Sequence, residues 1–121
     1  MKKILVVEDD TNIRNMLTSK LKSSGFVLTI AVDGSDAISK FKKERPVLVL
    51  VDLILPKQSG FEVIEAIRIK YNSQIPIIVL SNLDQPQDRE TALRLGVNEY
   101  IVKSNVSLRD LILKIQELLR K

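Results

Sequence analysis

The sequence predicts an α/β domain in which a parallel sheet is covered by helices on both faces. Short apolar segments rich in β-branched residues alternate with segments whose apolar residues recur at helical spacing. Runs such as Val47–Val51 lack the polar alternation of a half-exposed strand, which indicates strands buried on both sides. The length of 121 residues suits one domain. Five strand–helix repeats therefore predict one doubly wound domain of five strands and five helices, spanning residues 1–121.

The predicted strands are the apolar runs themselves. In chain order they cover Ile4–Val7, Phe26–Val32, Val47–Val51, Ile75–Leu80 and Tyr100–Val102. We expect the order 2-1-3-4-5 across the sheet, in which the first and third strands flank the point where the strand order reverses.

The predicted helices lie between the strands and after the last one. Their apolar positions are, in turn, Ile13, Met16, Leu17 and Leu21; Ala37, Ile38 and Phe41; Phe61, Ile64 and Ile67; Ala92, Leu93 and Leu95; and Leu108, Leu111, Ile112, Ile115 and Leu119. Ser59 and Ser107 each have an acidic residue three positions later, which is the spacing of a capping box. Asp10 precedes the first helix and predicts a cap there.

The composition excludes several kinds of chemistry. The chain has no His and no Cys, so it contains no disulfide, thiol nucleophile or imidazole base. The net charge of +4 comes from scattered basic residues, and two Tyr and three Phe are too few for a stacking platform, so we expect no direct binding of nucleic acid. The longest apolar run is far below the roughly 20 residues of a membrane span. We therefore expect a cytoplasmic protein without membrane contact.

Polar side chains follow the carboxyl ends of four predicted strands. They are Glu8-Asp9-Asp10, Asp52, Ser81 and Lys103. Ligands of open parallel sheets bind at this edge, so we expect Asp9 and Asp52 to face each other across a crevice, with Ser81 and Lys103 beside them. Neighbouring carboxylates repel one another unless a cation neutralises them, and an all-oxygen set of ligands favours Mg²⁺. A carboxylate, a metal, a lysine and a hydroxyl together suit phosphoryl transfer to an aspartate.

Each of these residues also has an ordinary structural explanation when taken alone. Glu8 and Asp9 could complement a helix dipole, Ser81 could be a loop residue, and Lys103 could be a solvated surface charge. Two enzyme types of the same architecture fit less well. A flavin carrier needs a phosphate-binding loop where the acidic run would repel phosphate. A phosphatase with its nucleophile on the first strand needs a second Asp two residues later, and Thr11 follows the acidic run.

Five motifs agree in content, spacing and order with one known family. They are Glu8-Asp9; Asp33-Gly34; Asp52-Leu53-Ile54-Leu55-Pro56 with Gly60 eight residues after Asp52; Pro76 to Ser81; and Gly96 through Tyr100-Ile101-Val102-Lys103. Over essentially its whole length the chain resembles the receiver domain of two-component response regulators, which has a flavodoxin-like fold. The resemblance implies a signalling switch and not a turnover enzyme. The alternative is a receiver-like binding module that works without phosphorylation.

The resemblance implies a phosphoacceptor and a metal site. Asp52 would attack the phosphorus of a phosphohistidine on a sensor histidine kinase or a phosphotransfer protein. Asp9 would bind Mg²⁺ directly and Glu8 through water. Asp52 and the backbone carbonyl of Ile54 would complete the set of protein ligands.

The resemblance also implies a path for the signal. Lys103 and Ser81 would hold phosphoryl oxygens, and Tyr100 would turn inward as Ser81 moves. This coupling would carry the signal to the face formed by the fourth helix, the fifth strand and the fifth helix. The output partner is not indicated. Glu99 and Lys114 could pair between subunits on this face, so a homodimer formed on activation is left open.

Three departures from the family pattern bear on the chemistry. Asn82 stands where the family usually has Ala or Gly, and we expect it to narrow access to the phosphoryl group. Ser104 replaces a Pro whose preceding bond is typically cis; because a cis bond before Ser costs about 3–4 kcal/mol, only the amine of Lys103 is expected in its usual place. Ile54 and Leu83 are apolar and flank the path of an attacking water, which predicts slow self-dephosphorylation.

Overall fold

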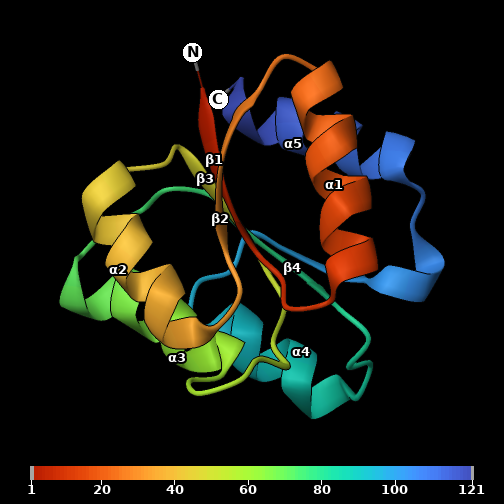
Figure 1. Cartoon of the computed structure of the whole chain (residues 1–121). Helices are drawn as coiled ribbons and strands as arrows, with labels where there is room; N and C mark the ends of the chain where they lie inside the picture. Colours follow the sequence, from red (N-terminus) through yellow and green to blue (C-terminus); the bar gives the residue numbers. More distant parts are fainter. Residues whose placement is uncertain (1, 121) are drawn as a thin grey trace.

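Five parallel strands lie between two layers of helices in the computed structural model, which describes residues 2–120 (Figure 1). The strands are β1 (Lys3–Val7), β2 (Val27–Ala31), β3 (Leu48–Val51), β4 (Ile77–Ser81) and β5 (Glu99–Val102). Their order is β2-β1-β3-β4-β5 and every neighbouring pair is parallel. The predicted fold class and strand order are thus confirmed. The strand ends differ from the predicted ones by no more than about two residues, since apolar residues flank several strands.

Helices alternate with the strands along the chain. They are α1 (Thr11–Ser23), α2 (Gly34–Glu44), α3 (Gly60–Glu65), α4 (Pro86–Arg94) and α5 (Leu108–Leu119), with a π-helical turn η1 (Ala66–Lys70) after α3 and a 3-10 turn η2 (Lys103–Asn105) after β5. The predicted caps are confirmed: Asp10, Ser59 and Ser107 each accept a hydrogen bond from the backbone N–H three residues later. Within residues 2–120, no helix combines the length and the apolar character needed to cross a membrane.

The two faces of the sheet bury separate sets of side chains. Successive residues of a strand point to opposite faces, so Ile4 and Val6 pack with α1 and α5, whereas Leu5 and Val7 pack with α2, α3 and α4. Figure 1 shows this division, with α1 and α5 on one side of the sheet and the other three helices on the opposite side. Strands buried on both faces explain why the sequence shows continuous apolar runs.

The strand register brings four chain segments to one edge of the sheet. Val7 of β1 pairs with Val51 of β3, and Val51 pairs with Val79 of β4. Ser81, at the end of β4, pairs with Val102 of β5. The residues that end or directly follow these strands are Glu8, Asp52, Ser81 and Lys103. The candidate polar residues therefore collect at the carboxyl edge, as the sequence predicts.

Two glycines allow the loop between β3 and α3 to pack closely. A Cβ atom on Gly60 would lie 2.3 Å from the carbonyl oxygen of Asp52, and one on Gly34 would lie 2.0 Å from the carbonyl oxygen of Gln58. Both distances are far inside van der Waals contact. The loop that follows Asp52 is thus held against α2 and α3 by positions that accept no side chain.

Candidate functional site

An acidic cluster with one lysine lies at the carboxyl edge of the sheet. Side-chain oxygens of Glu8, Asp9 and Asp52 all lie within 4.8 Å of one another. The Nζ atom of Lys103 lies 2.7 Å from Oε1 of Glu8 and 2.7 Å from Oδ2 of Asp52. Glu8 and Asp52 are 2% and 5% exposed, whereas Asp9 is open to solvent. The cluster therefore has a buried floor and one exposed carboxylate at its mouth.

The charges of the cluster perturb one another. Burial raises the pKa of Glu8 above its ordinary value, although hydrogen bonds from Lys103 and from the backbone N–H of Asp10 oppose the rise. Burial alone would lower the pKa of Lys103, but hydrogen bonds to Asp52 and Glu8, together with their charges, outweigh it and raise that pKa. Lys103 is thus held as a cation. One lysine does not balance three carboxylates, so the oxygens suit a divalent cation.

The segment after Asp52 supports its carboxylate from the backbone. The N–H of Ile54 donates to Oδ1 of Asp52 at 3.1 Å, while Oδ2 faces Lys103. The side chain of Ile54 is 55% exposed, so it borders the site without filling it. Each oxygen of Asp52 consequently has one donor within the protein.

Ser81 and Tyr100 are linked through the backbone of Leu83. The N–H of Leu83 donates to Oγ of Ser81 at 3.4 Å, and its carbonyl accepts a hydrogen bond of 2.7 Å from the hydroxyl of Tyr100. Ser81 is fully buried and Tyr100 is 5% exposed. Burial raises the pKa of the Tyr100 hydroxyl. A shift of the chain at Leu83 would therefore be felt by both side chains.

Arg89 is a neighbour of Tyr100 that the sequence does not predict. Its guanidinium lies 5.7 Å from the centre of the Tyr100 ring, within the range of a cation–π contact. Arg89 is an exposed residue of α4. Nothing in its local sequence distinguishes it from a solvated surface arginine, because the contact depends on how α4 packs on β5.

Replacement of the usual Pro by Ser104 leaves the Lys103 amine in the pocket. No peptide bond within residues 2–120 is cis. The chain instead forms the 3-10 turn η2 directly after β5. The Lys103 amine therefore lies beside the acidic cluster, although the backbone that follows it differs from the usual Lys–Pro geometry.

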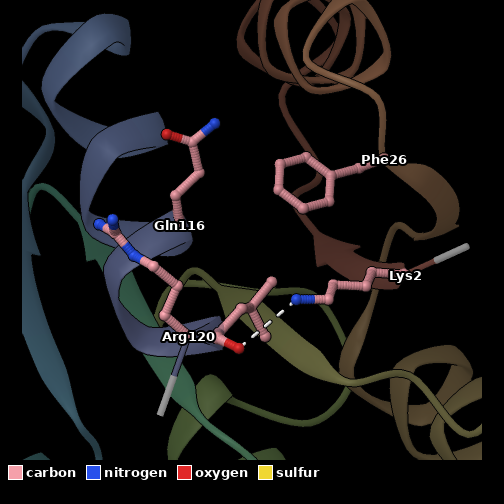
Figure 2. Close-up of a pocket in the computed structure, with 5 residues that line it drawn as sticks. Lys2, Phe26, Gln116 and Arg120 are labelled. Atoms are coloured by element: carbon pink, nitrogen blue, oxygen red, sulfur yellow. Dashed lines mark hydrogen bonds between the residues drawn. The ribbon is translucent and has the colours of Figure 1, made fainter.

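A separate hollow of about 290 Å³ lies near the amino end of β1, away from the acidic cluster. Its lining residues are Lys2, Phe26, Gln116, Leu119 and Arg120. Figure 2 shows Lys2 and Phe26 on one side and Gln116 and Arg120, from the end of α5, on the other. The amine of Lys2 donates to the carbonyl of Leu119 at 3.4 Å. With two cations and no carboxylate in its lining, this hollow offers no metal site.

Known proteins match this chain over nearly its full length. The family model described as the response regulator receiver domain matches residues 4–116. Relatives described as "Probable transcriptional regulator ycf27" are 41% identical in Porphyridium aerugineum, over 98% of this chain and 48% of that protein, and 41% identical in Cyanophora paradoxa, over 99% and 49%. The chain thus spans about half the length of these relatives.

Solved structures give the same result. A CheY-like response regulator receiver domain protein from Methanospirillum hungatei JF-1 superposes with a TM-score of 0.93 at 31% identity, over 99% of this chain and 94% of that one. The BeF3-activated N-terminal receiver domain of Klebsiella pneumoniae RstA has a TM-score of 0.91 at 28% identity, over 99% and 100%. The chain belongs to the receiver domain family of two-component response regulators, whose members are signalling modules.

Proposed function

We propose that residues 1–121 form one cytoplasmic domain that acts as a phosphorylation-dependent switch and accepts a phosphoryl group on Asp52. The observation that carries the proposal is the position of the Lys103 amine, 2.7 Å from both Asp52 and Glu8 at the carboxyl edge of the sheet. A fixed cation beside a carboxylate nucleophile is placed where phosphoryl oxygens would arrive. It can stabilise their negative charge without reorganising.

The transfer exchanges one bond to phosphorus for another. A carboxylate oxygen of Asp52 attacks the phosphorus of a phosphohistidine on the partner, and the bond from phosphorus to the imidazole nitrogen breaks. The electron pair of that bond stays on the imidazole, which leaves as a neutral ring when its other nitrogen already carries a proton and otherwise takes a proton from solvent. The product is an acyl phosphate on Asp52. Because this chain has no His, the donor histidine must belong to another domain or protein.

The acidic cluster fits a divalent metal ion. Carboxylate oxygens of Glu8, Asp9 and Asp52 lie close enough to share one ion, and a set made only of oxygen atoms is the set that Mg²⁺ prefers. We assign direct binding to Asp9 and Asp52, water-mediated binding to Glu8, and a backbone carbonyl ligand to Ile54. A bound Mg²⁺ would neutralise the negative charge that gathers when a phosphoryl group approaches these carboxylates.

The linked groups at Leu83 offer a route for the signal. A phosphoryl group adds nearly two negative charges and three acceptor oxygens, and the Ser81 hydroxyl can donate to one of them. Reorientation of Ser81 would disturb its contact with Leu83, and the Leu83 carbonyl holds the hydroxyl of Tyr100. The signal would thereby reach the face formed by α4, β5 and α5.

The partner that supplies the phosphoryl group would be a sensor histidine kinase or a phosphotransfer protein. An apolar hollow of about 190 Å³ between α1 and the start of α5 reaches Lys103 and includes the exposed Met16, so a partner can pack beside the site. Relatives named as probable transcriptional regulators suggest that the output is control of transcription, through a partner or a linked domain.

A homodimer formed on activation is a secondary proposal. Leu93 on α4 and Leu113 on α5 are 44% and 52% exposed and could supply apolar contact. Glu99 and Lys114, which the sequence offers as a pair between subunits, instead lie 3.8 Å apart within one chain. Gel filtration with and without beryllofluoride tests the dimer. A larger apparent mass with beryllofluoride supports it, and an unchanged mass contradicts it.

Phosphorylation by acetyl phosphate tests the main proposal. We expect the intact mass of the protein to increase by one phosphoryl group when Mg²⁺ is present and to stay unchanged with EDTA. Asp52→Asn should abolish the increase. Asp33→Asn is the matched control, because Asn caps a helix about as well as Asp and this position caps α2.

Two outcomes would count against the proposal. Labelling that persists in Asp52→Asn contradicts the assignment of the phosphoacceptor. An unlabelled wild-type protein, with a donor that labels another receiver domain in parallel, favours the binding module that works without phosphorylation.

A further inference from the structure

The side chain of Arg14 holds the backbone that presents the acidic pair. Its Nη1 atom donates to the carbonyl oxygens of Glu8 and Asp9, at 3.2 Å each. Arg14 lies in the first turn of α1 and is half-buried. Both carbonyls belong to the bend between β1 and α1, from which the carboxylates of Glu8 and Asp9 project toward Asp52.

The position of Arg14 is unfavourable for the helix itself. The amino end of a helix carries partial positive charge, so a cation in the first turn is disfavoured. The first turn of α1 contains no acidic residue that would balance it. The carboxylate of the Asp10 cap offsets part of this cost, and the two carbonyls give Arg14 a further compensating contact.

Arg14 leaves the neighbouring carboxylates free. Three acidic residues directly precede α1, yet none of the ion pairs among residues 2–120 involves Arg14. The guanidinium instead donates hydrogen bonds to neutral carbonyl oxygens. An arginine that bound a carboxylate would compete with a metal ion, whereas one that binds the backbone orients the carboxylates without occupying them.

Two further hydrogen bonds hold the bend between β1 and α1 through its N–H groups. The N–H of Glu8 donates to the carbonyl of Ala31 in β2 at 3.0 Å. The N–H of Asp10 donates to Oε2 of Glu8 at 3.2 Å. Among the described residues, Arg14 is the only one whose side chain donates to the carbonyl oxygens of Glu8 and Asp9. Its loss would remove the hydrogen bonds on the two carbonyls and allow the attached carboxylates to shift.

We infer that Arg14 is a positioning residue for a divalent cation at Glu8, Asp9 and Asp52. The inference rests on the proposed function, because it needs the acidic cluster to bind Mg²⁺. It adds a residue that touches neither metal nor phosphoryl group and that acts through the peptide units of the ligands.

The direction in which Mg²⁺ affinity changes when Arg14 is removed distinguishes a positioning role from a purely electrostatic one. If Arg14 acted only by its charge, its removal would take a cation away from a cation site and strengthen the binding of Mg²⁺. If it positions the ligands, its removal weakens binding, as does loss of groups that orient metal ligands in other proteins, by about tenfold or more. The two explanations therefore predict opposite changes.

Titration calorimetry with Mg²⁺ measures this directly in the wild-type protein and three variants. We expect Arg14→Ala and Arg14→Met to weaken binding about tenfold. Met keeps the length and packing of the side chain but has no donor. Arg14→Lys should recover part of the affinity, since an ammonium can reach one carbonyl at a time. Lys22→Ala is the control, because it removes an exposed cation from the same helix.

The outcomes distinguish the two proposals. Affinity in Arg14→Met that equals or exceeds that of the wild type overturns the role of Arg14 and leaves the proposed function intact. A wild-type protein that does not bind Mg²⁺ overturns the metal site and the role of Arg14 together. If Arg14→Ala fails to fold, as judged by circular dichroism, Arg14→Met and Arg14→Lys decide the question.

Discussion

The Lys103 amine reaches the acidic cluster although the residue after it departs from the family pattern. The sheet explains why. Val102 pairs with Ser81, so β5 delivers Lys103 to the carboxyl edge whatever the geometry of the next peptide bond. The turn η2 then accommodates Ser104. The sequence could thus predict the location of the amine from strand positions, while the form of the turn depended on local backbone preferences.

Ile54 gives the clearest prediction for a single side chain. We expect Ile54→Asn to speed the loss of the phosphoryl group from Asp52 by about tenfold, because a polar group beside the site can orient an attacking water. The side chain is 55% exposed, so the change should not disturb the core. The measurement is the decay of labelled protein after the phosphodonor is removed.

A distant isoleucine provides the control for this prediction. Ile69 in η1 is 70% exposed, and Ile69→Asn should leave the decay rate unchanged. Fast decay in the wild type that does not respond to Ile54→Asn would contradict the idea that apolar residues protect the acyl phosphate.

At the scale of elements, the loop between β3 and α3 connects the packing of α3 to the geometry of Asp52. The N–H of Gly60 donates to the carbonyl of Leu53 at 3.0 Å, and its α-carbon lies against the backbone of Asp52. The site is therefore built partly by the start of a helix that contributes no charged group to it.

Gly60→Ala should destabilise the protein by about 1–3 kcal/mol, the usual cost of overpacking. Its Cβ would lie 2.3 Å from the carbonyl oxygen of Asp52, so the loop must shift. Urea unfolding measures the loss. In the comparison variant Gly25→Ala the new methyl group meets open space but the φ angle is +94°, so only backbone strain acts. A free energy of unfolding for Gly60→Ala equal to that of the wild type would show that the loop tolerates the side chain.

The π-helical turn η1 shows what local sequence could not predict. The apolar spacing of residues 61–67 predicts one helix, but in the structure α3 ends at Glu65 and a wider turn that contains Arg68 follows it. Arg68 donates to the carbonyls of Ser73 and Gly96 and to the side chain of Asn98. Gly96 and Asn98 lie 28 and 30 residues further along the chain, so no pattern within the helix could reveal these two contacts. The contact of Arg89 with Tyr100 likewise depends on how α4 packs on β5.

For the whole molecule, burial of the sheet on both faces made the fold predictable. Continuous apolar strands and single-faced helices admit few other arrangements. The same arrangement made the candidate site predictable, because the ends of parallel strands meet at one edge. It did not reveal the backbone contacts of Leu83 or the bend before α1, since these depend on side chains from other elements.

Stability should depend on pH through Glu8 when metal is absent. Burial raises the pKa of Glu8 above its ordinary value of 4.5, so over the interval between these values the folded protein binds more protons than the unfolded chain. The contribution of Glu8 to the free energy of unfolding therefore falls as pH rises through that interval. Glu8→Gln removes this titration. We expect the stability of Glu8→Gln relative to the wild type to increase with pH and then level off.

Urea unfolding in EDTA at a series of pH values measures this difference. The attraction of Lys103 is already part of this titration, because it favours the ionised form of Glu8 and opposes the effect of burial on its pKa. If the difference in free energy of unfolding between Glu8→Gln and the wild type stays constant across the acidic range, burial does not raise the pKa of Glu8.

Chemical trapping of the acyl phosphate tests the central claim most directly. Borohydride reduces an aspartyl phosphate to homoserine: phosphate leaves with the oxygen that joins it to the acyl carbon, and the carbonyl is reduced to an alcohol, so the residue that carried the phosphoryl group is marked by a hydroxymethyl group in place of its carboxyl group. The protein would be phosphorylated with Mg²⁺ and acetyl phosphate, reduced, digested and analysed by mass spectrometry. We predict homoserine at position 52 and at no other acidic position. Homoserine at Asp9 or Asp10, or its absence from a protein shown to be phosphorylated, would contradict the account.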